Sequence, residues 1–228
     1  MYKEEEESMN EFFDNSNIKE ISDNFHKLLY YKGVWRNNNT KWMGNGMKKN
    51  PLDCWIYQEI LYETKPRFLI ECGCGGSTNY FYDIGRMCNE DFEIIAIDIN
   101  KTSIDKIKRK GVHKLLGNSI DLSILKEVNS IIGEETNNMV ILDSDHSMNH
   151  VFAELRLYNK FVGNNNYLVV EDTNLNGHPV RPNHIFGKGP YEAVEKFLLR
   201  NKSFIIDKEK EKFYATFHPN GFLKRINK

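Results

Sequence analysis

Cysteine, long apolar runs and an excess of charge are all scarce in this sequence, and each shortage narrows the class of protein. The four cysteines are too unevenly spaced for a disulfide framework: Cys54, Cys72, Cys74 and Cys88. No second Cys/His pair at ligand spacing accompanies Cys72 and Cys74, so a zinc site is not expected. We expect reduced thiols that pack as small apolar residues.

The lack of apolar runs and of net charge argues against membranes and nucleic acids as partners. No stretch approaches the roughly 20 apolar residues that span a bilayer, and the acidic start of the chain is unlike a secretory signal. The net charge is −1, so neither a nucleic acid nor an anionic membrane surface is expected to bind. With 228 residues, 40% apolar and 28% charged, the chain is typical of a globular cytoplasmic protein with one large domain.

Residues 1–50 differ in composition from the rest and predict an N-terminal extension. Apolar residues at 18, 21, 25, 28 and 29 follow the helical period, which predicts a packed helix over 18–31. Turn signals at 36–40 and 44–46 indicate that the segment from Trp35 to Pro51 is an ordered arm, either a cover on one sheet face or a substrate lid. The aromatic side chains of this extension could also pack on a second subunit in a homo-oligomer.

From Pro51 to the end, residues 51–228, the pattern alternates between strands and helices and predicts the main domain. Helices are expected at 51–63, 77–88, 101–110, 121–132, 148–161 and 190–200. Strands are expected at 67–72, 93–99, 113–116, 139–142, 167–171, 204–207 and 213–218. Strands separated by helices form a parallel sheet, and the last two add an antiparallel edge. The predicted fold class is α/β: a Rossmann-like, doubly wound, mostly parallel seven-stranded sheet with an N-terminal helical extension.

The first strand of the main domain runs into a glycine turn, which predicts a cofactor site. Glycine lets a ligand approach the backbone closely, and this turn faces the ligand crevice of a doubly wound sheet. The third glycine of the dinucleotide fingerprint is missing, and Glu71 suits a cationic amino-acid moiety better than a pyrophosphate. S-adenosylmethionine is therefore favoured over NAD, with a plain tight turn as the alternative. The candidates for contacting this cofactor are Glu71, Gly73, Gly75 and Ser77.

The ends of the next two strands extend this predicted cofactor site. Asp98 ends the second strand, where an acid commonly accepts the ribose hydroxyls of a cofactor. Its alternative role is in helix capping, since Asp98 or Asn100 could begin the next helix. Ser119 follows the third strand, where an adenine ring would lie.

Carboxylates gather where two later strands end. Asp143 and Asp145 follow the strand at 139–142, while Glu171 and Asp172 end the strand at 167–171. Such carboxylates repel one another unless they share a proton or bind a cation, and Mg²⁺ prefers oxygen ligands. We predict a magnesium site with three of these ligands; helix capping by Asp145 is the alternative.

Two histidines near these carboxylates are candidates for a general base. His146 directly follows Asp145, and His178 lies in a turn-rich loop after the fifth strand. The alternative for each is a solvated loop side chain with no catalytic role. Trp35, Trp42 and the loop at 173–189 are the candidates for covering the site.

These motifs resemble those of the cephalosporin hydroxylase/cephalosporin 7-α-methoxylation family of S-adenosylmethionine-dependent methyltransferases. The likeness extends from Trp35 to the C-terminus and rests on residues 51–60, 142–147 and 169–174, with 177–179. The family looks like the metal-dependent catechol-type O-methyltransferases in fold and cofactor. The resemblance implies magnesium on Asp145, Glu171 and Asp172, and a cofactor site lined by Glu71, Gly73, Asp98 and Ser119. Asp143 could contact the methionine end of the cofactor or replace Asp145 on the metal.

The sequence also departs from these relatives. The glycine turn is shorter than the family's usual form, and the lysine base of the catechol-type enzymes is replaced by Met148. No facial triad for iron is present, so oxygenase chemistry is not predicted. The expected activity is magnesium-dependent methylation of a hydroxyl on a sugar, a glycoside or another small natural product. The alternatives are an NAD(P)-dependent oxidoreductase on the same type of sheet and a non-catalytic subunit that binds S-adenosylmethionine.

Overall fold

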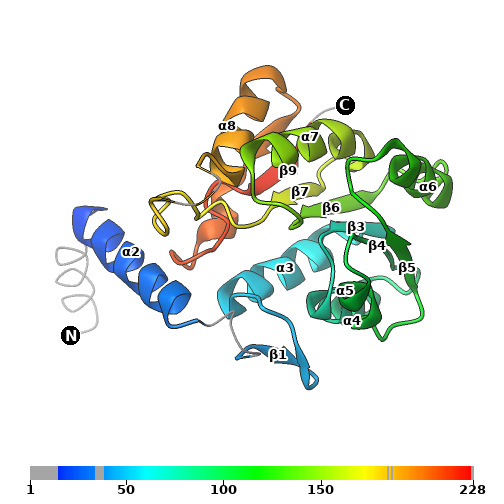
Figure 1. Ribbon diagram of the computed structural model, residues 1–228, viewed down its shortest axis with the longest axis horizontal. Coiled ribbons are helices and arrows are strands. Elements are labelled where there is room, and N and C mark those ends of the chain that lie inside the picture. The colour runs from blue at the N-terminus through cyan, green and yellow to red at the C-terminus, as the bar shows by residue number, and fades with distance from the viewer. Residues whose placement is uncertain (1–14, 34–38, 184, 186, 227–228) are drawn as a thin grey trace.

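The main sheet of the computed structural model has seven strands in the order β5-β4-β3-β6-β7-β9-β8. Residues 15–33, 39–183, 185 and 187–226 are described, which leaves Trp35 outside the described residues. The strands are β3 Phe68–Cys72, β4 Glu93–Asp98, β5 Val112–Leu116, β6 Asn138–Leu142, β7 Tyr167–Val170, β8 Phe204–Ile206 and β9 Phe222–Arg225. The first five are parallel, and β9 is antiparallel to both β7 and β8 (Figure 1). The predicted fold class is confirmed.

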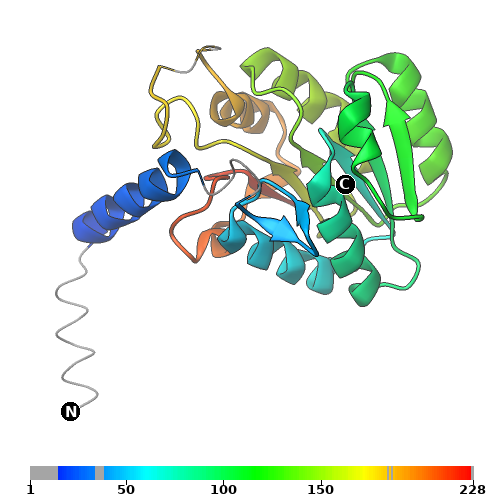
Figure 2. The same ribbon diagram turned by 60° about the horizontal axis from the view of Figure 1, so that its bottom comes forward.

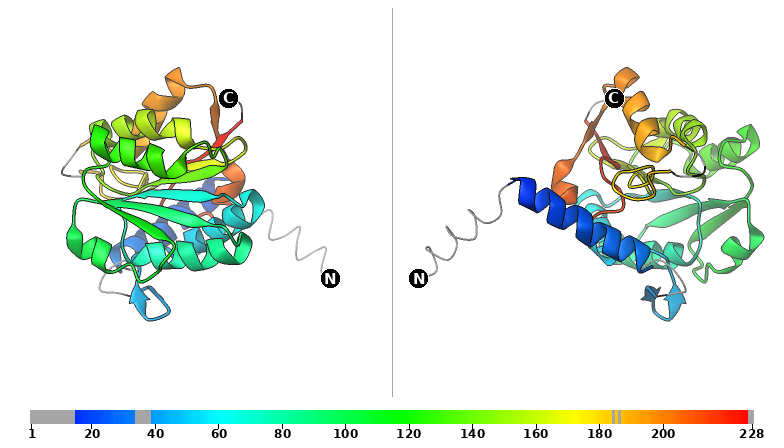
Figure 3. Two further views of the ribbon diagram at one scale, coloured as in Figure 1. Left: turned by 90° about the vertical axis from the view of Figure 1, so that its right-hand side faces the viewer. Right: turned by 60° about the vertical axis from the view of Figure 1, so that its left-hand side comes forward.

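Helices cover both faces of this sheet, as the left view of Figure 3 shows. One face carries α3 Pro51–Thr64, α4 Gly76–Cys88 and α5 Lys101–Asp105, and the other carries α6 Leu122–Ile132, α7 Met148–Tyr158 and α8 Pro190–Arg200. Alternate strand residues enter the two cores: Ile94 and Ala96 pack with α3 and α4, whereas Ile95 and Ile97 pack with α6 and α7. Because both faces are buried, the strands read as continuous apolar runs.

The last strand is not where the sequence predicted it. Residues 213–218 form no strand; they follow a 3₁₀ turn, Lys208–Glu211, and the strand is β9 at Phe222–Arg225. The backbone of 215–217 bonds to the start of α3 instead: Asn50 Nδ2 donates to the Ala215 carbonyl at 2.7 Å, and Asp53 Oδ2 accepts from the Phe217 amide at 2.9 Å. The prediction was wrong because residues 215–218, although irregular, are as buried as a strand.

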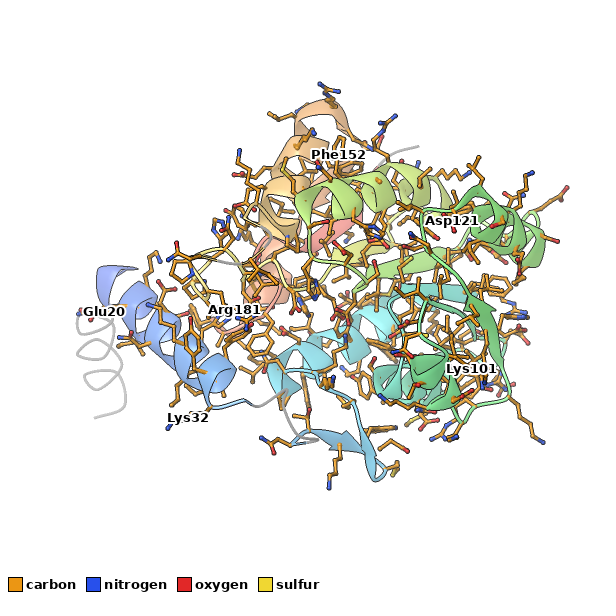
Figure 4. All side chains as sticks on the ribbon, in the orientation of Figure 1. Glu20, Lys32, Lys101, Asp121, Phe152 and Arg181 are labelled. Carbon is orange, nitrogen blue, oxygen red and sulfur yellow. The ribbon has the colours of Figure 1, made fainter. Side chains whose placement is uncertain are left out.

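The N-terminal helix α2, Asn15–Tyr31, lies beside the layered domain, and the predicted helix at 18–31 is confirmed (Figures 1 and 2). Its buried Tyr30 packs with Leu175, Val180 and Phe217. The loop that carries Arg181 lies between α2 and the sheet, and the Arg181 amide donates to the hydroxyl of Tyr31 at 2.9 Å (Figure 4). None of the helices among the described residues is long and apolar enough to cross a membrane.

A short hairpin follows α2 and precedes α3. Its strands are β1 Lys41–Trp42 and β2 Asn45–Gly46. The indole of Trp42 donates to Asp83 Oδ2 at 2.8 Å and packs edge-on against Tyr80, with ring centroids 5.1 Å apart. The hairpin is thus fixed to α4 (Figure 2). The division of the chain at residue 50 into extension and main domain stays a prediction.

Candidate active site

A cavity of about 780 Å³ opens at the carboxyl ends of the parallel strands. The chain order reverses there, because β4 and β5 lie on one side of β3 and β6 lies on the other. Ligands of open α/β sheets bind at such switch points. The lining includes residues 44–49, 73–77, 97–99, 117–119, 143–145 and His150. A cavity of this size accommodates a nucleoside with a side chain.

The glycine turn after β3 is pressed between two other segments. Gly73 has φ 83°, and a Cβ there would lie 2.0 Å from the carbonyl oxygen of Asp143. A Cβ on Gly76 would lie 1.8 Å from the carbonyl oxygen of Gly46 in the hairpin. At Gly75 an added Cβ would meet none of the described atoms within 4 Å. The turn therefore leaves open space at Gly75, where a ligand can approach the backbone.

Glu71 lies beneath this turn and is fully buried. Its carboxylate accepts from Ser77 Oγ at 3.1 Å and from Thr78 Oγ1 at 2.6 Å, which ties β3 to the first turn of α4. Burial raises the pKa of Glu71 to about 8. Ser77 lines the cavity, whereas Glu71 is not part of the lining and is linked to it through its hydrogen bond with Ser77. The predicted contact of Glu71 with a cofactor stays a prediction.

Asp98 and Ser119 both line the cavity, at the ends of β4 and β5. Asp98 accepts from the Asn100 amide at 2.7 Å, and Asn100 itself caps α5 through the Thr102 amide at 2.8 Å. The capping role thus belongs to Asn100, and Asp98 lines the cavity with a second carboxylate oxygen that accepts no hydrogen bond from the described part of the chain. Ser119 Oγ donates to Glu154 Oε1 at 2.5 Å.

Sequence reasoning missed Glu154 and His150, which lie four residues apart on α7. Glu154 is fully buried and also accepts from Ser144 Oγ at 2.6 Å, while its second oxygen has no hydrogen-bond partner among the described residues. His150 Nε2 lies 3.1 Å from Ser119 Oγ and 3.4 Å from Glu154 Oε1. The Glu154 carboxylate raises the pKa of His150 above its usual value. Their i, i+4 spacing was the one available signal.

Beyond this network, Asp143, His146 and Asp172 form a group whose ligand atoms all lie within 4.8 Å of one another. His146 Nε2 is 3.3 Å from Asp172 Oδ2. Asp172 adopts a left-handed φ of 54°, and its amide donates to His218 Nδ1 at 3.1 Å. Non-glycine residues in this region are strained, and such strain concentrates at functional sites. Because the chain turns here, the side chains of the adjacent Glu171 and Asp172 point in different directions: Asp172 joins His146, and Glu171 is buried.

Glu171 points into the protein, where a lysine meets it. Its Oε1 accepts from the Tyr57 hydroxyl at 2.7 Å, and its Oε2 accepts from Lys49 Nζ. Lys49 Nζ also donates to Asp143 Oδ2 at 2.7 Å. Burial lowers the pKa of Lys49, but Asp143 and Glu171 raise it more, so the net pKa lies well above the usual value. Lys49 could not be found from sequence, because its partners are 94 and 122 residues away.

Asp145 is exposed at the start of α7, outside this group. Its Oδ1 accepts from the Ser147 amide at 2.7 Å, in a turn that precedes the helix, whose N-cap residue is Ser147 and not Asp145. Burial acts to raise the pKa of Asp145, but the bonds from Ser147 outweigh it and lower the pKa below its usual value. The structure therefore groups Asp143, not Asp145, with His146 and Asp172; metal binding by Asp145 and Glu171 stays a prediction.

His178 lies in the loop before α8 and outside the residues that line the cavity. Its ring stacks on Tyr191 at 3.8 Å with an interplanar angle of 9°, and its Nε2 is 3.2 Å from Glu192 Oε1. Glu192 also accepts from the Gly189 amide at 2.7 Å, so loop and helix are tied together. Whether His146 or His178 acts as a base stays a prediction.

In fold, the chain is similar to solved structures of CmcI. The apo structure of CmcI-N160 aligns with a TM-score of 0.63 and 21% identity, covering 83% of this chain and 77% of that one. A structure described as cmcI-D160 with Mg and SAM aligns with a TM-score of 0.62 and 20% identity, covering 84% and 78%. The sheet order and the cavity at its switch point are those of a Rossmann-like domain.

The sequence comparisons identify the family. A family model described as "Rhamnosyl O-methyltransferase/CmcI" matches residues 34–226. The rhamnosyl O-methyltransferase of Mycobacterium tuberculosis (strain H37Rv) is 40% identical over 212 residues, which cover 90% of this chain and 85% of that protein. The one from Mycobacterium leprae is 38% identical over 214 residues, covering 90% of each chain. The chain belongs to the rhamnosyl O-methyltransferase/CmcI family, and the predicted family and enzyme class, an S-adenosylmethionine-dependent O-methyltransferase, are confirmed.

Proposed function

We propose that this chain is a magnesium-dependent enzyme that transfers the methyl group of S-adenosylmethionine to a hydroxyl of a sugar, with a rhamnose-type residue of a glycoside as the substrate. The observation that carries the proposal is that one residue, Asp143, belongs both to the lining of the cavity and to the group with His146 and Asp172. A methyl donor in the cavity and a hydroxyl beside the carboxylates would therefore be neighbours. The names of the mycobacterial relatives support a rhamnosyl substrate.

The cavity residues suit the parts of S-adenosylmethionine. Asp98, at the end of β4, is positioned to accept the ribose hydroxyls. Ser119, which follows β5, and His150, on α7, lie 3.1 Å apart in the lining of the cavity, where they would contact the adenine. The open space at Gly75 suits the methionine end, with the Ser77 hydroxyl at its edge. The CmcI structure described with Mg and SAM supports this cofactor.

The carboxylate group suits a hard divalent cation. Asp143 and Asp172 offer the oxygen ligands that Mg²⁺ prefers, and His146 lies beside them. Asp145 and Glu171, which the sequence predicts as metal ligands, are adjacent in the chain to His146 and Asp172 and are further candidates. When bound, the ion would lower the pKa of a substrate hydroxyl. The same CmcI structure supports magnesium.

The protein's own residues would orient the substrate and take up its proton. His146 is half-buried, is paired with Asp172 and lies nearest to the carboxylates, which makes it the first candidate to accept the hydroxyl proton. His178, held by Tyr191 and Glu192, is the second. The hairpin and the loop at 173–189 would exclude water, and alignment of oxygen, methyl and sulfur would supply much of the rate.

Titration calorimetry tests this proposal. S-adenosylmethionine should bind in EDTA and in magnesium, and a separate magnesium heat should disappear in Asp172→Asn. Asp121→Asn, an exposed residue before α6, should behave as wild type. Transfer to a rhamnoside should stop on chelation. Absence of cofactor binding would refute the proposal, binding of NAD would favour the oxidoreductase alternative, and full transfer in EDTA would remove the metal from the mechanism.

A further inference from the structure

A lysine ammonium lies between the carboxylates that end two neighbouring strands. Lys49 Nζ donates to Asp143 Oδ2 at 2.7 Å, after β6, and to Glu171 Oε2, after β7. The Lys49 side chain is only 5% exposed, and that of Glu171 only 3%. The other carboxylate oxygen of Glu171, Oε1, accepts a hydrogen bond from the Tyr57 hydroxyl. Asp143 is also a member of the group with His146 and Asp172, so Lys49 is in direct contact with the proposed metal site.

The backbone around Lys49 is fixed, so this contact is built into the fold. Lys48 before it has a left-handed φ of 54°. Asn50 after it caps α3 by accepting from the Leu52 amide at 3.2 Å, and it donates to the Ala215 carbonyl at 2.7 Å. A buried lysine without a partner would be strongly destabilising, and so would two buried carboxylates without a cation. Each therefore depends on the other.

A divalent cation that entered this site would meet the charge of the Lys49 ammonium there. Asp143 and Glu171 already share one positive charge, and both oxygens of Glu171 are engaged. An ion that bound these carboxylates would compete with the ammonium, because both need the same oxygen lone pairs and a cation repels a cation at short range.

We propose that Lys49 is a tethered cation that holds Asp143 and Glu171 together when the metal is absent and competes with the metal for these two carboxylates. The inference rests on the proposed function, since it assigns a role to Lys49 at the same site. It explains how Glu171, predicted from the sequence as a ligand, is bonded instead to a lysine. Lys49 is thus a positioning residue, which keeps the strand ends assembled and sets the metal affinity.

Magnesium titration of metal-free protein tests this role without any turnover. Lys49→Met retains the length and the apolar stem of the side chain but removes the ammonium. We expect Lys49→Met to bind Mg²⁺ about tenfold or more tightly than wild type, because the competing charge is gone. Lys48→Met, an exposed neighbour in the same wall of the cavity, removes one charge without breaking this contact and should change the affinity by less than about threefold. Equal or weaker binding by Lys49→Met would overturn the proposal.

Thermal unfolding provides a second readout. In EDTA, Lys49→Met should unfold several degrees below wild type, because Asp143 and Glu171 are left without their cation, and magnesium should restore most of the loss. A loss that magnesium does not restore would count against exchange of the two cations. Failure of the proposed function would look different, because wild type itself would then bind no S-adenosylmethionine.

A measurement on wild type keeps the inference testable if Lys49→Met does not fold. Reductive methylation followed by peptide mass spectrometry reports which amines are accessible. Lys49 should be protected in EDTA and become reactive as magnesium is added, while exposed Lys41 should react equally in both conditions. If Lys49 were as protected in saturating magnesium as in EDTA, magnesium would not displace its ammonium, and the proposal would be overturned.

Discussion

A Cβ added to Gly73 would lie 2.0 Å from the carbonyl oxygen of Asp143, so the turns after β3 and β6 are in contact through a backbone that admits no side chain. Gly73 also has φ 83°, where an L side chain is strained. We expect Gly73→Ala to lower the free energy of unfolding by about 2 kcal/mol or more, because both costs act together. Urea unfolding in EDTA measures this change.

Gly75→Ala is the matched control for this prediction. Gly75 has an extended φ of 170°, and an added Cβ would meet none of the described atoms within 4 Å. Its stability should stay within about 0.5 kcal/mol of wild type, although the methyl group would intrude on the cofactor space. A Gly73→Ala variant as stable as Gly75→Ala would show that the two strand ends are not packed as described.

The strand ends were predictable because their physics is local. Each of the strands β3, β6 and β7 is a short apolar run that stops at glycine or at carboxylates, and a parallel sheet brings such ends to one edge. The residues that gather there, such as Gly73, Asp143 and Asp172, were therefore named in advance. Their pairing was not predictable: whether Asp143 or Asp145 faces His146 depends on how the chain turns into α7.

Trp42 fixes the hairpin that forms one wall of the cavity. Its indole bonds to Asp83 at 2.8 Å and packs edge-on against Tyr80. Trp42→Ala should release the hairpin and weaken S-adenosylmethionine binding about tenfold, since the wall must then be ordered on binding. Met43→Ala, at the exposed tip of the same hairpin, should bind as wild type does. Calorimetry compares the two, and equal affinities would mean that the hairpin takes no part in binding.

What the sequence could not reveal are contacts made across long chain separations. Lys49 reads as one of several lysines in a polar arm, and nothing near it in the chain marks it as buried. The segment at 213–218 reads as a strand in the sequence, and its residues 215–218 are buried like those of a strand, yet Asn50 and Asp53 bond its backbone in place of a neighbouring strand. In both cases tertiary contacts replace the local signal on which sequence reasoning depends.

Glu154 organises the part of the cavity beside Ser119 and Ser144 from within α7. It accepts from Ser119 at 2.5 Å and from Ser144 at 2.6 Å, and both serines line the cavity. Glu154→Ala should deprive Ser144 and Ser119 of their shared acceptor, leave Ser119 with His150 alone and create a void in the core, costing about 2–4 kcal/mol of stability and weakening cofactor binding about tenfold. Asn149→Ala, on the exposed face of the same helix, should change neither quantity. Unchanged cofactor affinity in a folded Glu154→Ala would assign the network to stability alone.

Glu71 should make the stability of the protein depend on pH near neutrality. Burial raises its pKa from 4.5 to about 8, so the folded protein keeps a proton that the unfolded chain releases. Its contribution to stability is full below the unfolded pKa and is lost as pH rises through the folded pKa, at about 1.4 kcal/mol per pH unit in between. Glu71→Gln has no such proton to lose.

Urea unfolding at several pH values between 5 and 8 therefore separates the two proteins. Wild type should lose stability relative to Glu71→Gln as the pH rises, whereas Glu127→Gln, an exposed residue of α6, should follow wild type at every pH. EDTA in all samples keeps divalent ions out of the comparison. If the curves of Glu71→Gln and wild type ran parallel, Glu71 would be ionised in the folded protein, and its carboxylate would already carry the charge expected of a partner for the cofactor's cationic end.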